Sequence, residues 1–123
     1  MTTTTIVLIV DDSRVSRMMV RQYIAGLQPD WIVEEAATGE ESLLKARAAR
    51  PDLILMDVNM PGMGGIAAAE QLRQDYPDLP ISLLTANVQT ATRERAVQLG
   101  IGFVEKPITE ARIAQLLATL KAA

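Results

Sequence analysis

The sequence predicts an α/β domain in which a doubly wound, five-stranded parallel sheet is covered by helices on both faces. Short continuous apolar runs alternate five times with segments of helical length, and strands buried on both faces have such continuous runs. Pro and Gly fall singly between these segments, and no repeat or linker interrupts them. Right-handed crossovers then give a three-layer sandwich with the common strand order 2-1-3-4-5. The whole chain, 1–123, is expected to be one domain.

The first strand is predicted over 6–10, where five apolar residues precede Asp11. A helix is predicted from about Arg14 to Leu27, because apolar residues recur at steps of four and three on one face. That face carries Val20, Ile24 and Leu27, and another face carries Arg14, Arg17 and Arg21.

The second unit has a weaker strand over Trp31–Ala36. The next residues, Thr38 to Glu41, form a capping-box pattern that begins a helix. That helix should close before Pro51, because a residue that precedes proline disfavours helical backbone.

The third strand covers Leu53–Met56 and ends at Asp57. The segment Met60–Gly65 is predicted to be a loop, because a helix does not tolerate so many Gly and Pro residues. A helix from Ile66 to about Asp75 should follow.

The last two units repeat this arrangement. The fourth strand covers 81–84 and ends at Thr85, and a helix over Thr90–Leu99 is expected to stop at Gly100. A short strand over 103–105 follows, and Thr109 is expected to cap the last helix. The apolar stripe of that helix consists of Ile113, Leu116, Leu117 and Leu120.

Composition excludes several kinds of chemistry. With no Cys, the chain has no disulfide framework, thiolate metal site or cysteine nucleophile. With no His, it has no imidazole base or Ser-His-Asp triad, and it cannot be a phosphohistidine donor. A net charge of −3 without a basic stripe argues against direct binding to nucleic acid.

No apolar run approaches the roughly 20 residues of a membrane span, and the Thr-rich start lacks the basic residues of a secretory signal. The sequence therefore predicts no membrane association and a cytoplasmic location.

Polar residues follow the predicted strands at their carboxyl ends, where doubly wound sheets bind ligands. Neighbouring strands are about 4.8 Å apart, so the carboxylates of Asp11, Asp12 and Asp57 should converge within roughly 6 Å. Two such charges about 5 Å apart repel by on the order of 3 kcal/mol at an effective dielectric constant near 20. Either raised pKa values or a bound cation must offset this repulsion.

A cluster of oxygen ligands suits Mg²⁺ or Mn²⁺. The candidate ligands are Asp11, Asp12 and Asp57 with the backbone carbonyl of Asn59. An alternative role for Asp11 and Asp12 is to cap the following helix and interact with its dipole.

Asp57 is the candidate nucleophile, because the Gly-rich loop after it should leave its carboxylate accessible. A carboxylate can attack a phosphoryl group to form an acyl phosphate. The alternative role is that of an ordinary turn initiator at a strand end. Thr85 could donate a hydrogen bond to a phosphoryl oxygen, and the long stem of Lys106 could bring its charge close to Asp57.

Four segments of the chain resemble the signature segments of response regulator receiver domains of the CheY-like kind. They are Val10–Ser13, Leu55–Pro61, Leu84–Ala86 and Phe103–Pro107. The order 2-1-3-4-5 is itself the order of flavodoxin and of this family, so the resemblance and the predicted order are not independent. Gly64 departs from the family pattern, which commonly has Asp there to cap a helix.

The resemblance implies that Asp57 accepts a phosphoryl group from a sensor histidine kinase or phosphotransfer protein. Asp11, Asp12 and the Asn59 carbonyl would hold Mg²⁺ there, and Lys106 would contact the phosphoryl oxygens.

The resemblance also implies a conformational switch. Thr85 would move toward the phosphoryl group, and Phe103, which could equally be a plain core residue, would turn inward. A downstream effector would then bind the face formed by the fourth helix, the fifth strand and the fifth helix. The family has a cis Lys106–Pro107 bond.

The function expected is therefore phosphorelay signalling in a two-component system, with chemotaxis as a candidate pathway. The protein would promote only its own phosphorylation and dephosphorylation. The alternatives are a receiver excised from a larger regulator or hybrid kinase, a constitutive binding module, and a small Mg²⁺-dependent phosphohydrolase. Against the hydrolase, Asn59 stands where a general acid would be expected, and the chain has no length for a substrate cap.

Overall fold

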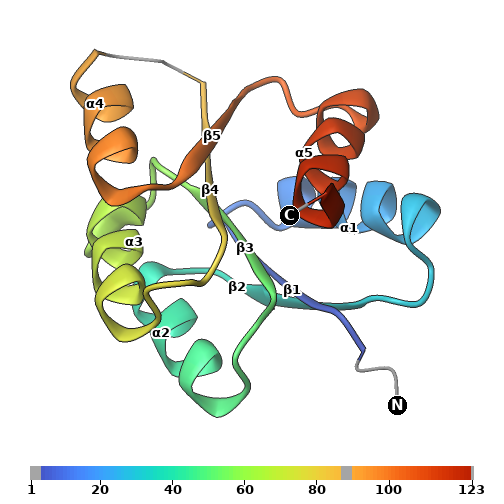
Figure 1. Ribbon diagram of the computed structural model, residues 1–123, viewed down its shortest axis with the longest axis horizontal. Coiled ribbons are helices and arrows are strands. Elements are labelled where there is room, and N and C mark those ends of the chain that lie inside the picture. The colour runs from blue at the N-terminus through green and yellow to red at the C-terminus, as the bar shows by residue number, and fades with distance from the viewer. Residues whose placement is uncertain (1–3, 87–89, 123) are drawn as a thin grey trace.

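The computed structural model describes residues 4–86 and 90–122, which form a parallel sheet of five strands between two layers of helices (Figure 1). The strands are β1 (Ile6–Val10), β2 (Ile32–Ala36), β3 (Leu53–Asp57), β4 (Ile81–Thr85) and β5 (Gly102–Glu105). The helices are α1 (Arg14–Leu27), α2 (Gly39–Ala48), α3 (Gly64–Asp75), α4 (Thr90–Leu99) and α5 (Glu110–Ala122). The strand order is β2-β1-β3-β4-β5 and every pairing is parallel, which confirms the predicted doubly wound fold.

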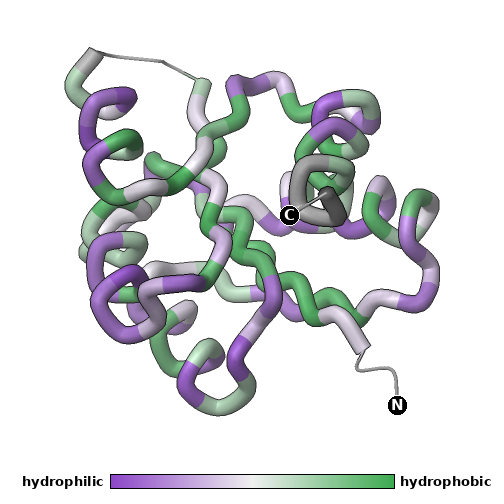
Figure 2. The backbone as a smooth tube through the Cα atoms, in the orientation of Figure 1, coloured by the Kyte–Doolittle hydropathy of each residue, from purple (hydrophilic) through white to green (hydrophobic). Residues whose placement is uncertain are grey.

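Each face of the sheet has its own hydrophobic core. Helices α1 and α5 cover one face, and α2, α3 and α4 cover the other (Figure 1). The central strands β3 and β4 are buried along their whole length, and the tube in Figure 2 is most hydrophobic along the strands at the centre. Burial on both faces explains why these strands are continuous apolar runs rather than alternating ones.

Two helices begin at the predicted caps. The Thr38 side chain accepts a hydrogen bond from the Glu41 N–H at 3.0 Å, and the Glu41 carboxylate accepts one from the Ala37 N–H at 2.7 Å. The Thr109 side chain likewise accepts from the Arg112 N–H at 3.2 Å. The hydrogen bonds accepted by Thr38 and Thr109 satisfy N–H groups in the first turns of α2 and α5 that have no partner inside the helix.

Helix α4 ends at Leu99 and is terminated by Gly100, as predicted. Gly100 has φ +67°, a backbone conformation that glycine adopts without steric cost. Its N–H donates to the Val97 carbonyl and the Ile101 N–H donates to the Ala96 carbonyl, each at 3.0 Å. These are the two hydrogen bonds of a Schellman motif.

The predicted start of α3 is wrong by two residues, because the helix begins at Gly64 rather than Ile66. A Cβ atom at Gly65 would lie 2.0 Å from the carbonyl oxygen of Asp57, so the first turn of α3 lies directly against the end of β3. Glycines therefore allow this helix to begin here. The N-cap residue Met63 makes no side-chain cap hydrogen bond, in keeping with the missing Asp at Gly64.

Other boundaries differ from the predictions by single residues. Strand β2 begins at Ile32 rather than Trp31, and β5 begins at Gly102 rather than Phe103. In the predicted stripe of α5, Ile113 and Leu117 are buried, whereas the side chain of Leu120 lies outside the described part of the structure. No helix in the described ranges is long and apolar enough to cross a membrane.

Candidate functional site

The three predicted carboxylates meet at the carboxyl ends of β1 and β3. Val10 pairs in register with Met56, which makes Asp11 and Asp57 neighbours at the next position. One carboxylate oxygen from each of Asp11, Asp12 and Asp57 lies within 4.8 Å of the other two. The expected convergence within roughly 6 Å is therefore confirmed.

Lys106 reaches the same cluster from the loop after β5. Its Nζ atom lies 2.9 Å from Oδ1 of Asp57, and its backbone N–H donates to the Thr85 carbonyl at 2.7 Å. The Lys106–Pro107 peptide bond is cis, as the resemblance implied. Three carboxylates and one ammonium group leave two negative charges without a counterpart among these four side chains.

Asp57 is more buried than the sequence predicted. Its side chain is 4% exposed, because the first turn of α3 packs against its backbone and Lys106 lies over its carboxylate. The contact with Lys106 is an ion pair without hydrogen-bond geometry, and within residues 4–86 and 90–122 Oδ1 has no hydrogen-bond partner. A buried carboxylate oxygen in this state is costly unless a ligand satisfies it.

Burial raises the pKa of Asp11 above its ordinary value. The Ser13 N–H donates to its Oδ1 at 2.8 Å and opposes this shift, whereas the charge of Asp57 adds to it. Burial is therefore the main cause of the raised pKa of Asp11, and repulsion from the neighbouring carboxylates is a smaller contribution in the expected direction.

Helix α1 is capped by Ser13, whose hydroxyl accepts a hydrogen bond from the Ser16 N–H at 3.2 Å. The helix therefore does not need Asp11 or Asp12 as its capping residue.

Thr85 is the last residue of β4 and is 1% exposed. Phe103 pairs with Leu83 in register, so Thr85 and Phe103 lie on the same face of the sheet, two residues apart along the strands. Phe103 packs against the core beneath α3 and α4, away from the carboxylates. Asn59 is exposed, two residues beyond Asp57 in the loop before α3.

The cluster fits a hard divalent cation. It offers three carboxylates within 4.8 Å, an excess of two negative charges and a buried Oδ1 atom that lacks a hydrogen-bond donor. Mg²⁺ and Mn²⁺ prefer oxygen ligands of this kind.

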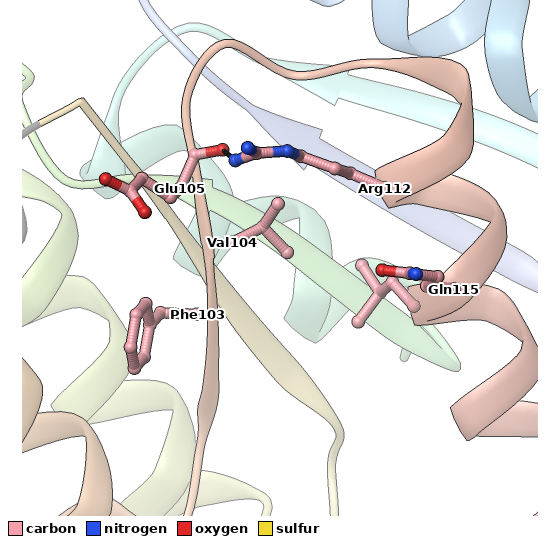
Figure 3. A pocket seen from close by; sticks show the side chains of 6 residues that line it. Phe103, Val104, Glu105, Arg112 and Gln115 are labelled. Carbon is pink, nitrogen blue, oxygen red and sulfur yellow. Dashed lines mark hydrogen bonds between the residues drawn. The ribbon is translucent and has the colours of Figure 1, made fainter.

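A cleft of about 200 Å³ opens beside Asp11 and Lys106, between α1 and the loop after β5. Exposed apolar side chains continue the surface of α1 next to it, namely Val15, Met18 and Met19. A larger hollow of about 490 Å³ lies elsewhere, between β5 and α5 (Figure 3).

Arg17 supports the site, which its position on a polar face of α1 did not predict. The Arg17 guanidinium donates to the Asp11 carbonyl at 2.7 Å and pairs with Glu35 at 2.9 Å. Arg21 pairs with the other oxygen of Glu35 at 2.8 Å. The available signal was the spacing of Arg17 and Arg21, one helical turn apart and close in the fold to a strand that carries Glu35.

The fold and the site define a doubly wound α/β domain with a cluster of carboxylates at the carboxyl ends of its strands, and comparison with known proteins identifies the family. The response regulator receiver domain matches residues 7–118, and the chain belongs to this family. The chain has the fold of receiver domains in two-component signalling, and it has an acidic pocket like theirs.

Response regulator GacA of Pseudomonas viridiflava is 36% identical over 112 residues, which cover 90% of this chain and 52% of GacA. VraR of Staphylococcus aureus is 35% identical over 95 residues, covering 77% and 46% of the two chains. The chain thus spans about half the length of these relatives. The structure of the chemotaxis protein CheY4 of Vibrio cholerae is similar with a TM-score of 0.88, 33% identity and coverage of 96% and 99%.

Proposed function

We propose that the protein receives a phosphoryl group on Asp57 from a sensor histidine kinase or a phosphotransfer protein. The observation that carries this proposal is the environment of Asp57. Its buried Oδ1 has no hydrogen-bond donor among the described residues, and it lies 2.9 Å from a lysine ammonium and beside two more carboxylates. A carboxylate in this setting is available both to attack a phosphorus atom and to share a cation.

In the proposed step, a carboxylate oxygen of Asp57 attacks the phosphorus of an N-phosphorylated imidazole on the donor protein. A P–O bond forms as the P–N bond breaks, and the imidazole leaves with the bonding electron pair and takes up a proton. Lys106 remains beside the new acyl phosphate and offsets part of its charge. The protein has no His of its own, so the donor must be another molecule.

Asp11, Asp12 and Asp57 would hold the cation together with the backbone carbonyl of Asn59. Bound Mg²⁺, or Mn²⁺, supplies positive charge to the phosphoryl oxygens and lowers the repulsion that they meet from the carboxylates. Arg17 supports this arrangement, because its hydrogen bond to the Asp11 carbonyl fixes the backbone at the end of β1.

The donor protein would dock over α1. The cleft beside Asp11 and Lys106 lies next to the exposed Val15, Met18 and Met19 of this helix. An apolar patch that borders a polar cleft is suited to a protein partner that must bring a reactive side chain to it.

Phosphorylation would change partner affinity through Thr85 and Phe103. We propose that Thr85 moves toward the phosphoryl group, that Phe103 then turns inward, and that the surface formed by α4, β5 and α5 binds a downstream effector. This surface includes the hollow between β5 and α5 (Figure 3). A coupling of about 1–3 kcal/mol would change the effector affinity 5- to 150-fold.

We propose that residues 1–123 form one receiver domain that acts in the cytoplasm. Its activity is confined to its own phosphorylation and dephosphorylation, without direct binding to nucleic acid or a membrane. A substrate-hydrolysing enzyme has no comparable support, because Asn59 cannot serve as a general acid.

Incubation with acetyl phosphate and Mg²⁺ tests the proposal. We expect a single phosphoryl adduct by intact mass, mapped to the peptide that contains Asp57. The adduct should be absent without a divalent cation and in Asp57→Asn. An adduct on another residue, or none in the wild-type protein, would refute the assignment of Asp57.

A further inference from the structure

Phe103 is on β5 and pairs in register with Leu83 of β4. Figure 3 shows its ring on the opposite side of β5 from Arg112 and Gln115. The ring packs on the core beneath α3 and α4 and is half-buried. A ring in this position has one side against apolar residues and another side available to a polar neighbour.

That neighbour is Arg93, on the first half of α4. The Cζ atom of its guanidinium group lies 5.2 Å from the centroid of the Phe103 ring, which is within the range of a cation–π contact. Arg93 is exposed, and among residues 4–86 and 90–122 no carboxylate forms an ion pair with it. The ring is therefore the partner to which this guanidinium group is attracted.

The other end of α4 is fixed to α3. Arg95 pairs with Glu70 at 2.6 Å, and Arg73 of α3 donates to the carbonyls of Leu99 and Gly100 at 3.0 and 3.3 Å. These contacts hold the helix in place over the sheet, so that Arg93 is presented to the ring on β5. If the ring turned inward, the guanidinium group would lose this contact while α4 stayed anchored at its C-terminal end.

We propose that Arg93 acts as a latch, meaning that its contact with the ring holds Phe103 in the half-buried position described above while the protein is unphosphorylated. The contact therefore raises the free energy that is needed to turn the ring inward. This inference rests on the proposed function, because it assumes that phosphorylation at Asp57 turns the ring inward. A contact made in one conformation and lost in the other favours the first. By linkage, removal of the contact must tighten the binding of any ligand that favours the second conformation.

The chain has one Phe, so incorporation of 4-fluorophenylalanine labels position 103 alone. Fluorine NMR can then follow the ring while beryllium fluoride, a mimic of a phosphoryl group on a carboxylate, is titrated in the presence of Mg²⁺. For the wild-type protein we expect the resonance to move to a new position at saturation.

In Arg93→Gln we expect the starting resonance to lie closer to the saturated position, and the titration midpoint to fall about two- to fivefold. Arg93→Lys retains a cation and should give a midpoint between those of the other two proteins. Arg50→Gln is the matched control with the same change in charge, because Arg50 lies 6.0 Å from the ring of Tyr76. Its midpoint should equal that of the wild-type protein or lie slightly above it, because only the charge is lost.

The outcomes separate the two proposals. Loss of a positive charge by itself weakens anion binding and moves the midpoint of Arg93→Gln upward, so an upward or unchanged midpoint overturns the latch. A wild-type protein that binds beryllium fluoride, as shown by a higher unfolding temperature, without a shift of the fluorine resonance overturns the latch but not the role of Asp57. No binding by any of the proteins overturns both.

Discussion

Glu35 lies near the acidic cluster of Asp11, Asp12 and Asp57 in this fold, and the charges of the two regions are balanced in different ways. Burial raises the pKa of Glu35, but hydrogen bonds from Arg17 and Arg21 outweigh it and hold the pKa below its ordinary value. Burial also raises the pKa of Asp11, and there the charge of Asp57 adds to the shift. Glu35, paired with two arginines, therefore stabilises the folded chain without a bound cation. The acidic cluster retains an excess of negative charge that a cation can offset.

The close approach of α3 to the end of β3, beside the acidic cluster, predicts the largest effect. In Gly65→Ala the new Cβ would lie 2.0 Å from the Asp57 carbonyl oxygen, so we expect a loss of roughly 3 kcal/mol in the free energy of unfolding. Urea unfolding measures it. Gly26→Ala is the control, because nothing lies within 4 Å of its Cβ position in α1, and it should gain about 0.5–1 kcal/mol. Equal stability of the two variants would contradict the close approach.

Magnesium should stabilise the acidic cluster and leave the Glu35 pair unaffected. At a concentration 100 times the dissociation constant, Mg²⁺ should add about 2.7 kcal/mol to the free energy of unfolding, and chelation should remove this gain. Asp12→Asn should lose most of the response and Glu35→Gln should keep it. Urea unfolding at constant ionic strength measures the effect, and a full response in Asp12→Asn would argue against the proposed ligand set.

Without a divalent cation, Asp11→Asn should raise stability at pH 7 by on the order of 1 kcal/mol, because it removes one of the repelling charges. The amide oxygen can still accept the hydrogen bond from Ser13. The folded-state pKa of Asp11 is raised, so its favourable contribution is present below pH 3.8 and is lost as the pH rises through the folded-state pKa. The advantage of the variant should therefore grow with pH and disappear in acid. A variant less stable than the wild type in EDTA would mean that the cluster is not strained.

Glu35→Gln should show the opposite dependence on pH. Its pKa is depressed in the folded state, so the stabilisation is present above pH 4.5 and is lost as the pH falls through the folded-state pKa. The side chain is 31% exposed, so we expect a loss of only about 0.5–1 kcal/mol at pH 7. Urea unfolding of the wild-type protein and of Glu35→Gln at pH 7 and pH 3 measures the difference in their free energies of unfolding. A difference of the same size at the two pH values would contradict this prediction.

The fold was largely predictable from local patterns. Continuous apolar runs define the buried strands, and Thr38, Thr109 and Gly100 carry the capping chemistry of their helices. The start of α3 was not predictable in the same way. Gly64 and Gly65 look like loop residues along the chain, and only the contact with the end of β3 explains why a helix begins there.

The site was predictable in its members and less so in its environment. The strand ends bring Asp11, Asp12 and Asp57 together. The long side chain of Lys106 reaches Asp57, as predicted. The burial of Asp57 was missed because it depends on how α3 folds back against the end of β3 and on Lys106, which is distant in sequence. The cation–π contact of Arg93 with Phe103 was missed because it depends on how α4 packs against β5.

The hydrogen bonds from Arg73 to the C-terminal end of α4 determine from which end this helix unfolds locally. With the carbonyls of Leu99 and Gly100 held by α3, fraying must proceed from the N-terminal turn toward Gly100 rather than from both ends. Backbone amides late in α4 should therefore exchange their hydrogens with solvent more slowly than those early in it. Local melting of α4 and the presentation of its surface are in this way set by an arginine on the neighbouring helix.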